Sequence, residues 1–377
     1  MKRFSTFIII VLLFNLFPAG SAYAVGHPSI SVPSAILMEQ ETGEVLFEAD
    51  ADNKRAPASV TKVMTLLLIM EALERKEIST ETIVTVSAEA AGMGGSQVYL
   101  KEGETMTVDE MIKCIAVVSA NDCCVAMAEH LCGSVDSFIT AMNERAKSLG
   151  MVNTHFNSCT GLDTDDHYTT ARDIAIMSRA LMTHKEIQKY TTIWMDTVRN
   201  GAFTLSNTNR LVRYYEGATG LKTGFTADAG YCLSATASKD GLSLIAVVLG
   251  AETSDQRFND AKALLSFGFS RYKFYTDSPK RPENVTVIKG TDEDVRPILA
   301  EEPAFLIEKG QEDSITYTIS LPKDVMAPVE KGQRLGTVQY TANGTPLGTI
   351  NLLAEKEVPK VTFGHLFFKL IQYFFTV

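Results

Sequence analysis

Three closely spaced strand-like segments limit the folds that this chain can adopt. Residues 220–223, 230–237 and 242–249 are rich in apolar and β-forming side chains. Asp240-Gly241, between the last two segments, is a strong signal for a two-residue hairpin turn. Because so short a turn joins antiparallel neighbours, these segments predict the centre of an antiparallel sheet.

The N-terminal part of the same region is expected to complete this sheet. Residues 35–38 and 45–47 are strand-like, with a turn between them. Thr107 and Glu110 have the spacing of a helix capping box. Helical patterns cover residues 59–73, 111–118, 122–131, 135–149, 169–183 and 256–267. Strands at both ends with helices between them predict an α/β (α+β) fold, in which one antiparallel sheet is flanked by helices.

A change in composition near residues 278–282 predicts a second domain. Residues 284–355 contain short runs rich in Val, Ile, Thr and Tyr, separated by turn residues such as Asn343-Gly344. This pattern indicates a small all-β domain without a cluster of catalytic residues. The predicted division of the chain is residues 1–24, 25–275, 280–357 and 358–377.

The first 24 residues resemble a secretory signal peptide. Lys2 and Arg3 precede an apolar run over residues 7–17, and Ala22 and Ala24 provide a small-x-small cleavage site. An apolar run of this length is too short to span a membrane comfortably, which takes about 20 residues. We therefore predict secretion to an extracytoplasmic location; an uncleaved N-terminal anchor is the alternative.

The last segment, residues 358–377, is expected to form an amphipathic helix. Its polar residues recur at helical spacing: Thr362, His365, Lys369, Gln372 and Thr376. The large apolar face predicts attachment to the outer surface of the cytoplasmic membrane, helped by Lys360 and Lys369 near anionic headgroups. The alternative is a terminal helix that docks on the protein core.

Charge and cysteine content exclude several classes of function. The formal net charge of −10 argues against nucleic acid as a partner, because phosphate binding needs a basic surface. The spacing of the six cysteines fits no zinc site, and neither a metal nor an organic cofactor is predicted. Cys123 and Cys124 are adjacent and make a poor disulfide pair; one disulfide among the other four cysteines stays open.

Three short elements carry groups suited to nucleophilic catalysis, in the order Ser59-Val-Thr-Lys62, Ser119-Ala-Asn121 and Lys222-Thr223-Gly224. The first alone is weak evidence, because Ser270-Arg-Tyr-Lys273 matches it too. If Ser59 opens a helix, Lys62 lies one turn later on the same face and its amine can reach the Ser59 hydroxyl. A neutral amine there can act as the base that activates the serine. The structural alternative is an N-cap serine followed by an exposed lysine.

The other two elements provide groups that fit the same reaction. Ser119 can relay a proton to a leaving amine, and Asn121 can hydrogen-bond a substrate amide. Lys222 and the Thr223 hydroxyl can bind a terminal carboxylate, while Gly224 lets a substrate backbone approach closely. Taken singly, these residues are also ordinary turn formers and a strand end.

In this order the three elements resemble the signature of the penicillin-binding proteins and serine β-lactamases. The resemblance is closest to the low-molecular-weight D-Ala-D-Ala carboxypeptidases and includes Gly94-Gly95-Ser96, Thr170-Ala-Arg-Asp173 and Lys222-Thr-Gly-Phe-Thr-Ala-Asp-Ala-Gly230. It covers nearly the whole mature chain. It implies a β-lactamase/transpeptidase-like catalytic domain that removes the terminal D-alanine from peptidoglycan stem pentapeptides and is inhibited by β-lactam antibiotics.

The resemblance also assigns roles to individual residues. Ser59 would be the acylated nucleophile and Lys62 the base, with Ser119 as the second-motif serine and Lys222 binding substrate. The backbone N–H groups of Ser59 and Phe225 would form the oxyanion hole.

One loop departs from the family pattern, and three alternatives stay open. The family often carries Asn-Pro-His-Gly-Leu where this chain has Asn157-Ser-Cys-Thr-Gly161-Leu162, which puts substrate preference in doubt. The alternatives are a serine β-lactamase, a DD-endopeptidase and a non-catalytic wall-binding protein. A β-lactamase of the commonest class needs a water-positioning glutamate, and no glutamate between Ser119 and Lys222 has the matching context.

Overall fold

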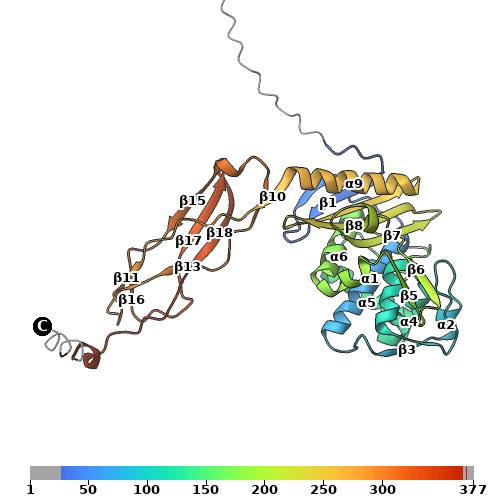
Figure 1. Cartoon of the computed structure of the whole chain (residues 1–377), viewed down its shortest axis with the longest axis horizontal. Helices are drawn as coiled ribbons and strands as arrows, with labels where there is room; N and C mark the ends of the chain where they lie inside the picture. Colours follow the sequence, from blue (N-terminus) through green and yellow to red (C-terminus); the bar gives the residue numbers. More distant parts are fainter. Residues whose placement is uncertain (1–26, 368–370, 372–377) are drawn as a thin grey trace, which may run out of the picture.

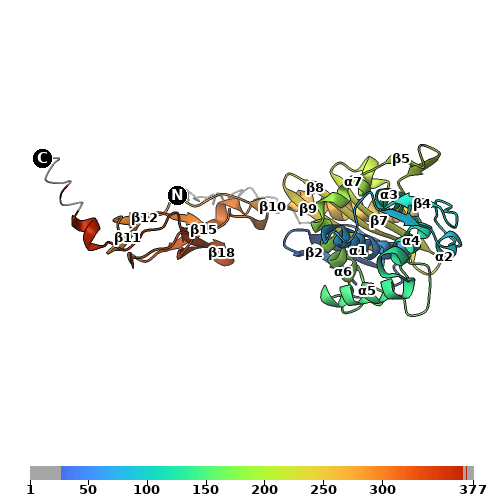
Figure 2. The same cartoon turned by 90° about the horizontal axis from the view of Figure 1, so that it is seen from below.

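The computed structural model describes residues 27–367 and residue 371, which form two domains lying end to end (Figure 1, Figure 2). The N-terminal domain is built on a five-stranded sheet in the order β2-β1-β9-β8-β7, with every neighbouring pair antiparallel. Its strands are β1 (Ser34–Glu39), β2 (Val45–Ala49), β7 (Ala218–Thr226), β8 (Gly230–Lys239) and β9 (Leu242–Ala251). The prediction of one antiparallel sheet completed by the N-terminal pair is confirmed.

Strand β9 is apolar along most of its length because both faces of the sheet are covered. Side chains alternate across a strand, so Leu244 and Ile245 point to opposite faces. Leu244 belongs to a buried cluster with Phe258 of α9 (Ser254–Arg271). Ile245 belongs to the larger cluster on the other face, together with Met64. Figure 1 shows the same arrangement, with α9 above the sheet and α1, α4, α5 and α6 below it.

The helices on the second face form two successive layers. They are α1 (Lys62–Glu74), α3 (Val108–Val118), α4 (Asn121–Cys132), α5 (Val135–Ser148) and α6 (Ala171–Thr183). Helix α6 packs on β1 and β9, and α1 packs on α6 and α4. Helix α1 is therefore surrounded by protein, and Val63, Leu66 and Ile69 are fully buried.

Short elements complete the N-terminal domain. They are β3 (Ile83–Thr85), β4 (Thr105–Thr107), β5 (Met195–Val198), β6 (Phe203–Ser206), α2 (Ala88–Ala91), α7 (Gln188–Thr191), α8 (Leu211–Tyr214), η1 (Ala58–Thr61) and η2 (Lys185–Ile187). β3 pairs with β4 and β5 pairs with β6.

Local sequence signals determine several of these boundaries. Asp240 and Gly241 both have positive φ, +50° and +79°, as a type I′ hairpin turn requires. The Thr107 hydroxyl accepts from the Glu110 N–H, and the Glu110 carboxylate accepts from the Thr107 N–H. The predicted hairpin and capping box are thus confirmed.

The C-terminal domain is built from strands, as predicted. They are β11 (Val285–Ile288), β12 (Asp294–Val295), β13 (Pro297–Leu299), β14 (Phe305–Glu308), β15 (Ile315–Ser320), β16 (Asp324–Met326), β17 (Arg334–Ala342) and β18 (Thr345–Ala354), with the short turn η3 (Glu312–Ser314). The sheet orders are β13-β18-β17-β15 and β12-β11-β16. The Tyr340 ring is fully buried against those of Tyr275, Phe305 and Tyr317.

The two domains are joined through a strand pair. β10 (Tyr272–Tyr275) follows α9 directly and pairs with β14. Residues 276–284 then lead into the second domain without forming a helix or strand. The boundaries at residues 275 and 280 stay a prediction.

The two predicted terminal segments lie largely outside the described residues. The signal peptide, residues 1–24, lies wholly outside them. Within the described part of the C-terminal segment, residues 363–367 are helical, and Phe363 and Phe367 expose their rings and stack with centroids 6.4 Å apart. In the part of the chain that the structure describes, no helix is long and apolar enough to cross a membrane.

Candidate active site

Ser59 lies in a strained turn at the start of α1. The sequence predicts a helix from residue 59, but η1 is a single 3₁₀ turn and the α-helix begins at Lys62. Ala58, just before the serine, has φ +48°, a conformation that costs a non-glycine residue free energy. The Thr61 hydroxyl donates to the Ala58 carbonyl at 2.8 Å and closes the turn. The half-buried Ser59 is thereby presented on a constrained backbone.

The Lys62 amine is fully buried and contacts three oxygen atoms. Its Nζ lies 2.8 Å from Ser59 Oγ, 2.7 Å from Asn121 Oδ1 and 2.7 Å from the Thr160 carbonyl oxygen. The Asn121 amide is oriented by its Nδ2, which donates to the Gly94 carbonyl at 2.8 Å. Asn121 Oδ1 and the Thr160 carbonyl can only accept, whereas the serine hydroxyl can also donate.

These three partners suit a neutral amine. A neutral lysine has two N–H groups for the two acceptors and one lone pair that can receive the Ser59 proton. Burial lowers the pKa of Lys62 from its usual value of 10.5, although the nearby Cys124, Cys159 and Asp122 act in the opposite direction. The arrangement therefore favours the protonation state that a general base needs.

Ser119 and Asn121 occupy the sharp turn between α3 and α4. Ser119 ends α3 in the left-handed conformation, with φ +65°, and Asn121 is the first residue of α4. The Asn121 N–H donates to the Ser96 carbonyl at 2.7 Å, so the segment Gly94-Gly95-Ser96 lies beside this turn. Within the described residues, Ser119 Oγ is buried without a hydrogen-bond partner. A buried hydroxyl without a partner requires an explanation, and an absent substrate group can supply one.

Strand β7 brings Lys222, Thr223 and Gly224 to the edge of the sheet. β7 pairs only with β8 in the sheet order, so its other edge faces η1. A Cβ on Gly224 would lie 3.0 Å from the Pro57 carbonyl oxygen and 3.0 Å from the Ser59 nitrogen. Glycine is therefore needed here, because the strand runs directly against the turn that carries Ser59.

Lys222 is buried beside the same turn. Its Nζ donates to the Thr223 carbonyl at 2.9 Å. Burial is the main cause that lowers the pKa of Lys222 well below 10.5, and the nearby Lys62 charge lowers this pKa further. An anionic substrate group would raise the pKa of Lys222 again and favour its charged form.

Phe225 follows Gly224 on β7 and carries the second predicted oxyanion donor on its backbone. Its side chain is 54% exposed and packs against the Tyr231 ring, with centroids 4.3 Å apart. The structure therefore brings all seven residues of the three motifs, and Phe225, to one site between η1, the α3–α4 turn and β7.

Several residues of this site were not predicted as site residues. The Thr160 backbone carbonyl binds Lys62, and a Cβ on Gly161 would lie only 1.9 Å from the Ala58 carbonyl oxygen. Thr208 Oγ1 lies 2.7 Å from Thr223 Oγ1. Arg257 of α9 donates from Nη1 to the Gly224 carbonyl at 2.9 Å. None of these residues belongs to the three catalytic motifs. Thr160 and Gly161 lie in the loop that departs from the family pattern, and Thr160 contacts Lys62 through its main chain.

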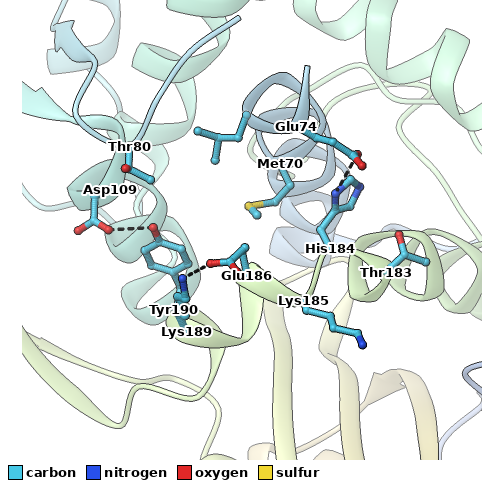
Figure 3. Close-up of a pocket in the computed structure, with 11 residues that line it drawn as sticks. Met70, Glu74, Thr80, Asp109, Thr183, His184, Lys185, Glu186, Lys189 and Tyr190 are labelled. Atoms are coloured by element: carbon cyan, nitrogen blue, oxygen red, sulfur yellow. Dashed lines mark hydrogen bonds and ion pairs between the residues drawn. The ribbon is translucent and has the colours of Figure 1, made fainter. Parts of the chain in front are cut away.

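A pocket at the other end of α1 is separate from this site. It has a volume of about 600 Å³ and is lined by Met70, Leu73 and Glu74 (Figure 3). A helix rises about 1.5 Å per residue, so Leu73 lies about 20 Å from Ser59 along the helix axis. Three pairs of lining side chains contact each other: His184 with Glu74 at 3.4 Å, Tyr190 with Asp109 at 2.8 Å, and Lys189 with Glu186. None of the motif residues lines it.

Neither metals nor disulfides contribute to the described structure. Among the described residues, no group of three or more His, Cys, Asp and Glu side chains is placed to hold a metal ion. All six cysteines lie in the described part of the chain and are unpaired there.

Comparisons with known proteins identify the family of the chain. The sequence model of the D-alanyl-D-alanine carboxypeptidase family matches residues 21–253, and that of the penicillin-binding protein 5 C-terminal domain matches residues 269–360. D-alanyl-D-alanine carboxypeptidase DacF of Bacillus subtilis is 39% identical over 96% of both chains.

Two solved structures show the same folds. Penicillin-binding protein 5 of Haemophilus influenzae is 30% identical and superposes with a TM-score of 0.75, covering 89% of this chain and 99% of that one. Penicillin-binding protein D2 of Listeria monocytogenes, solved with ampicillin bound, is 34% identical with a TM-score of 0.60, covering 65% of this chain and all of that one.

Proposed function

The chain belongs to the D-alanyl-D-alanine carboxypeptidase family, and from this premise we propose that its reaction proceeds through an acyl-enzyme on Ser59. It is a serine-type D-Ala-D-Ala carboxypeptidase of the penicillin-binding kind, a hydrolase that acts on peptidoglycan stem peptides and binds β-lactams. Its substrate places it outside the cytoplasm. The β-lactamase and non-catalytic alternatives are not favoured, since the family and its relatives are named as carboxypeptidases.

The observation that carries the proposal is the contact between Lys62 Nζ and Ser59 Oγ at 2.8 Å. In the first step, the Lys62 lone pair takes the hydroxyl proton while Ser59 Oγ attacks the carbonyl carbon between the two D-alanines. The backbone N–H groups of Ser59 and Phe225 stabilise the developing oxyanion. Support for this comes from Gly224, because a Cβ there would lie only 3.0 Å from the Ser59 nitrogen and β7 therefore runs close to the nucleophile's turn.

The other two motifs, Ser119-Ala-Asn121 and Lys222-Thr223-Gly224, bind the substrate and protonate the leaving group. The open edge of β7 can pair with the extended backbone of a peptide, as an added strand would. Lys222 and Thr223 bind the terminal carboxylate. Ser119, whose hydroxyl has no other partner among the described residues, passes a proton to the departing D-alanine amine. Asn121 hydrogen-bonds the substrate amide besides orienting Lys62.

Mass spectrometry of the penicillin adduct tests the assignment of the nucleophile. We expect the adduct on the peptide that contains Ser59, and loss of labelling in Ser59→Ala with unchanged thermal stability. Ser270→Ala is the matched control, because Ser270 also precedes a lysine by three residues but is exposed and donates to the Phe267 carbonyl. An adduct on another residue would refute the assignment.

We further propose that residues 358–377 attach the protein to the outer face of the cytoplasmic membrane. The exposed Phe363 and Phe367 rings support this, since exposed aromatic side chains on a helix favour a membrane interface. Val358 is the last fully buried residue that the structure describes. Removal of residues 360–377 should therefore leave both domains folded and release the protein from membranes. Retention of the truncated protein in the membrane fraction would contradict the proposal.

A further inference from the structure

We propose that His167 is a positioning residue for the acylation of Ser59. Its ring joins the loop that supplies the Thr160 carbonyl to the turn that carries the nucleophile. This inference rests on the function proposed above, because it concerns the same site.

Three consecutive hydrogen bonds make this connection. The Asn157 backbone N–H donates to His167 Nδ1 at 2.9 Å, and His167 Nε2 lies 2.9 Å from Thr61 Oγ1. The Thr61 hydroxyl donates to the Ala58 carbonyl at 2.8 Å. A backbone N–H can only donate, so Nδ1 accepts, and a neutral ring then carries its proton on Nε2. The Nε2–H donates to Thr61, which makes the direction of every bond in the series unique.

Both ends of this series lie next to reacting groups. Ala58 immediately precedes Ser59 and is held at φ +48°, a conformation that relaxes unless its surroundings fix it. Asn157 begins the loop whose Thr160 carbonyl accepts from Lys62. The hydrogen bonds of the His167 ring go to Thr61 and Asn157, not to Ser59. His167 acts by setting the distance between the nucleophile's turn and the loop that orients the base.

The surroundings of the ring keep it neutral. His167 is 6% exposed and packs against the Phe156 ring, with centroids 5.9 Å apart. The titratable groups on the loop that carries the ring are His155, its partner Asp166, Asp163 and Asp165, and Lys62 lies beyond Thr61. Burial, with a smaller contribution from His155, lowers the pKa of His167 to about 4. A proton on Nδ1 would place two donors face to face and break the contact with Asn157.

Variants at two residues test the proposal. His167→Ala removes both ring contacts, and Thr61→Val removes the hydroxyl between the ring and Ala58 with little change in volume. His167→Gln can still donate a hydrogen bond to Thr61, so its acylation rate should be higher than that of His167→Ala. His155→Ala is the matched control, because that ring lies on the same loop but is half-buried, hydrogen-bonds Asp166 and packs beside Tyr168 without contacting Thr61 or Asn157 in the bonds described above.

The measurement is the first-order acylation rate constant at saturating fluorescent penicillin, on protein quantified by active-site titration, with thermal unfolding in parallel. We expect a loss of about 100-fold in His167→Ala, the size that a misplacement of about 1 Å produces, and a loss in the same direction in Thr61→Val. The double variant should lose no more than the larger single loss. His155→Ala should stay within about twofold of the wild type.

The opposite results would overturn the proposal. If His167→Ala and Thr61→Val melt at a lower temperature but acylate within about twofold of the wild type, His167 has only a structural role. If His167→Ala does not fold, Thr61→Val decides alone. The labelled peptide separates this failure from failure of the proposed function, because the adduct on Ser59 would persist when only the role of His167 is wrong.

Discussion

Substitution of Gly161 by alanine should impair catalysis through a backbone collision. A Cβ at this position would lie 1.9 Å from the Ala58 carbonyl oxygen, whereas ordinary contacts begin at 3.4 Å. The loop or the nucleophile's turn must therefore move by about 1.5 Å. Either movement stretches the bond between Lys62 and the neighbouring Thr160 carbonyl, which is 2.7 Å long.

The substitution Gly161→Ala should have two separate effects, a loss of stability and a loss of acylation rate. Gly161 has φ +82°, and an alanine in the left-handed region costs roughly 1–2 kcal/mol. The displacement adds a kinetic cost, because a misplacement of about 1 Å in a catalytic site can reduce the rate about 100-fold. Gly150 is the matched control: its φ is +79°, but no atom lies within 4 Å of an added Cβ. Gly150→Ala should lose similar stability from strain and acylate normally.

The assay is acylation by a fluorescent penicillin under single-turnover conditions, with thermal unfolding of both variants. We expect both to lose stability and only Gly161→Ala to lose acylation rate. Equal acylation rates in the two variants would refute the reasoning, since the collision with Ala58 would then have no effect on the site.

Three further predictions follow from the pKa values and contacts. The acylation rate should rise with pH through the lowered pKa of Lys62 and level off below pH 10.5; a rate still rising at pH 10.5 would contradict a base whose pKa burial lowers. The pKa of His167 is about 4 folded and 6.5 when unperturbed, so its contribution to stability is complete above pH 6.5 and falls by about 3 kcal/mol as the pH approaches 4. The free energy of unfolding, measured with denaturant, should fall more steeply with decreasing pH in the wild type than in His167→Gln between pH 6.5 and 4. Parallel pH dependences of the two proteins would exclude the contribution of His167. Thr208→Val should raise KM more than it lowers kcat, because Thr208 contacts Thr223 and not Ser59; an unchanged KM in steady-state hydrolysis of a D-Ala-D-Ala peptide would argue against this.

The fold could be predicted to the level of its layers because the relevant signals are local. A hairpin at Asp240-Gly241 and a capping box at Thr107 determine their own geometry through turn conformation and hydrogen bonds within four residues. Element ends were less accurate. Helix α9 extends over Ser254–Arg271, beyond the predicted 256–267, because its ends are stabilised by packing and by the Thr253 cap.

The motif residues of the site were identified because each carries a distinctive side chain. Their supporting contacts were not identified, since these depend on distant segments that only the fold brings together. The base, Lys62, is oriented by Asn121 and Thr160. These two residues follow it in the chain by 59 and 98 positions, respectively. The Ser59 segment was also predicted as plain helix, because the left-handed Ala58 is imposed by tertiary contacts and has no propensity signal.

The contact between Lys62 and residue 160 uses a main-chain oxygen, so this contact does not require a particular side chain at position 160. Any amino acid supplies such a carbonyl. The loop that presents this carbonyl does depend on side chains, because Ser158 Oγ accepts from the Thr160 and Gly161 N–H groups and Cys159 packs in the core. Gly161 is sterically prevented from changing, because an added Cβ would lie 1.9 Å from the Ala58 carbonyl oxygen. The catalytic acceptor is thus supplied by the main chain, and its position depends on how closely the loop lies against the turn that carries Ser59.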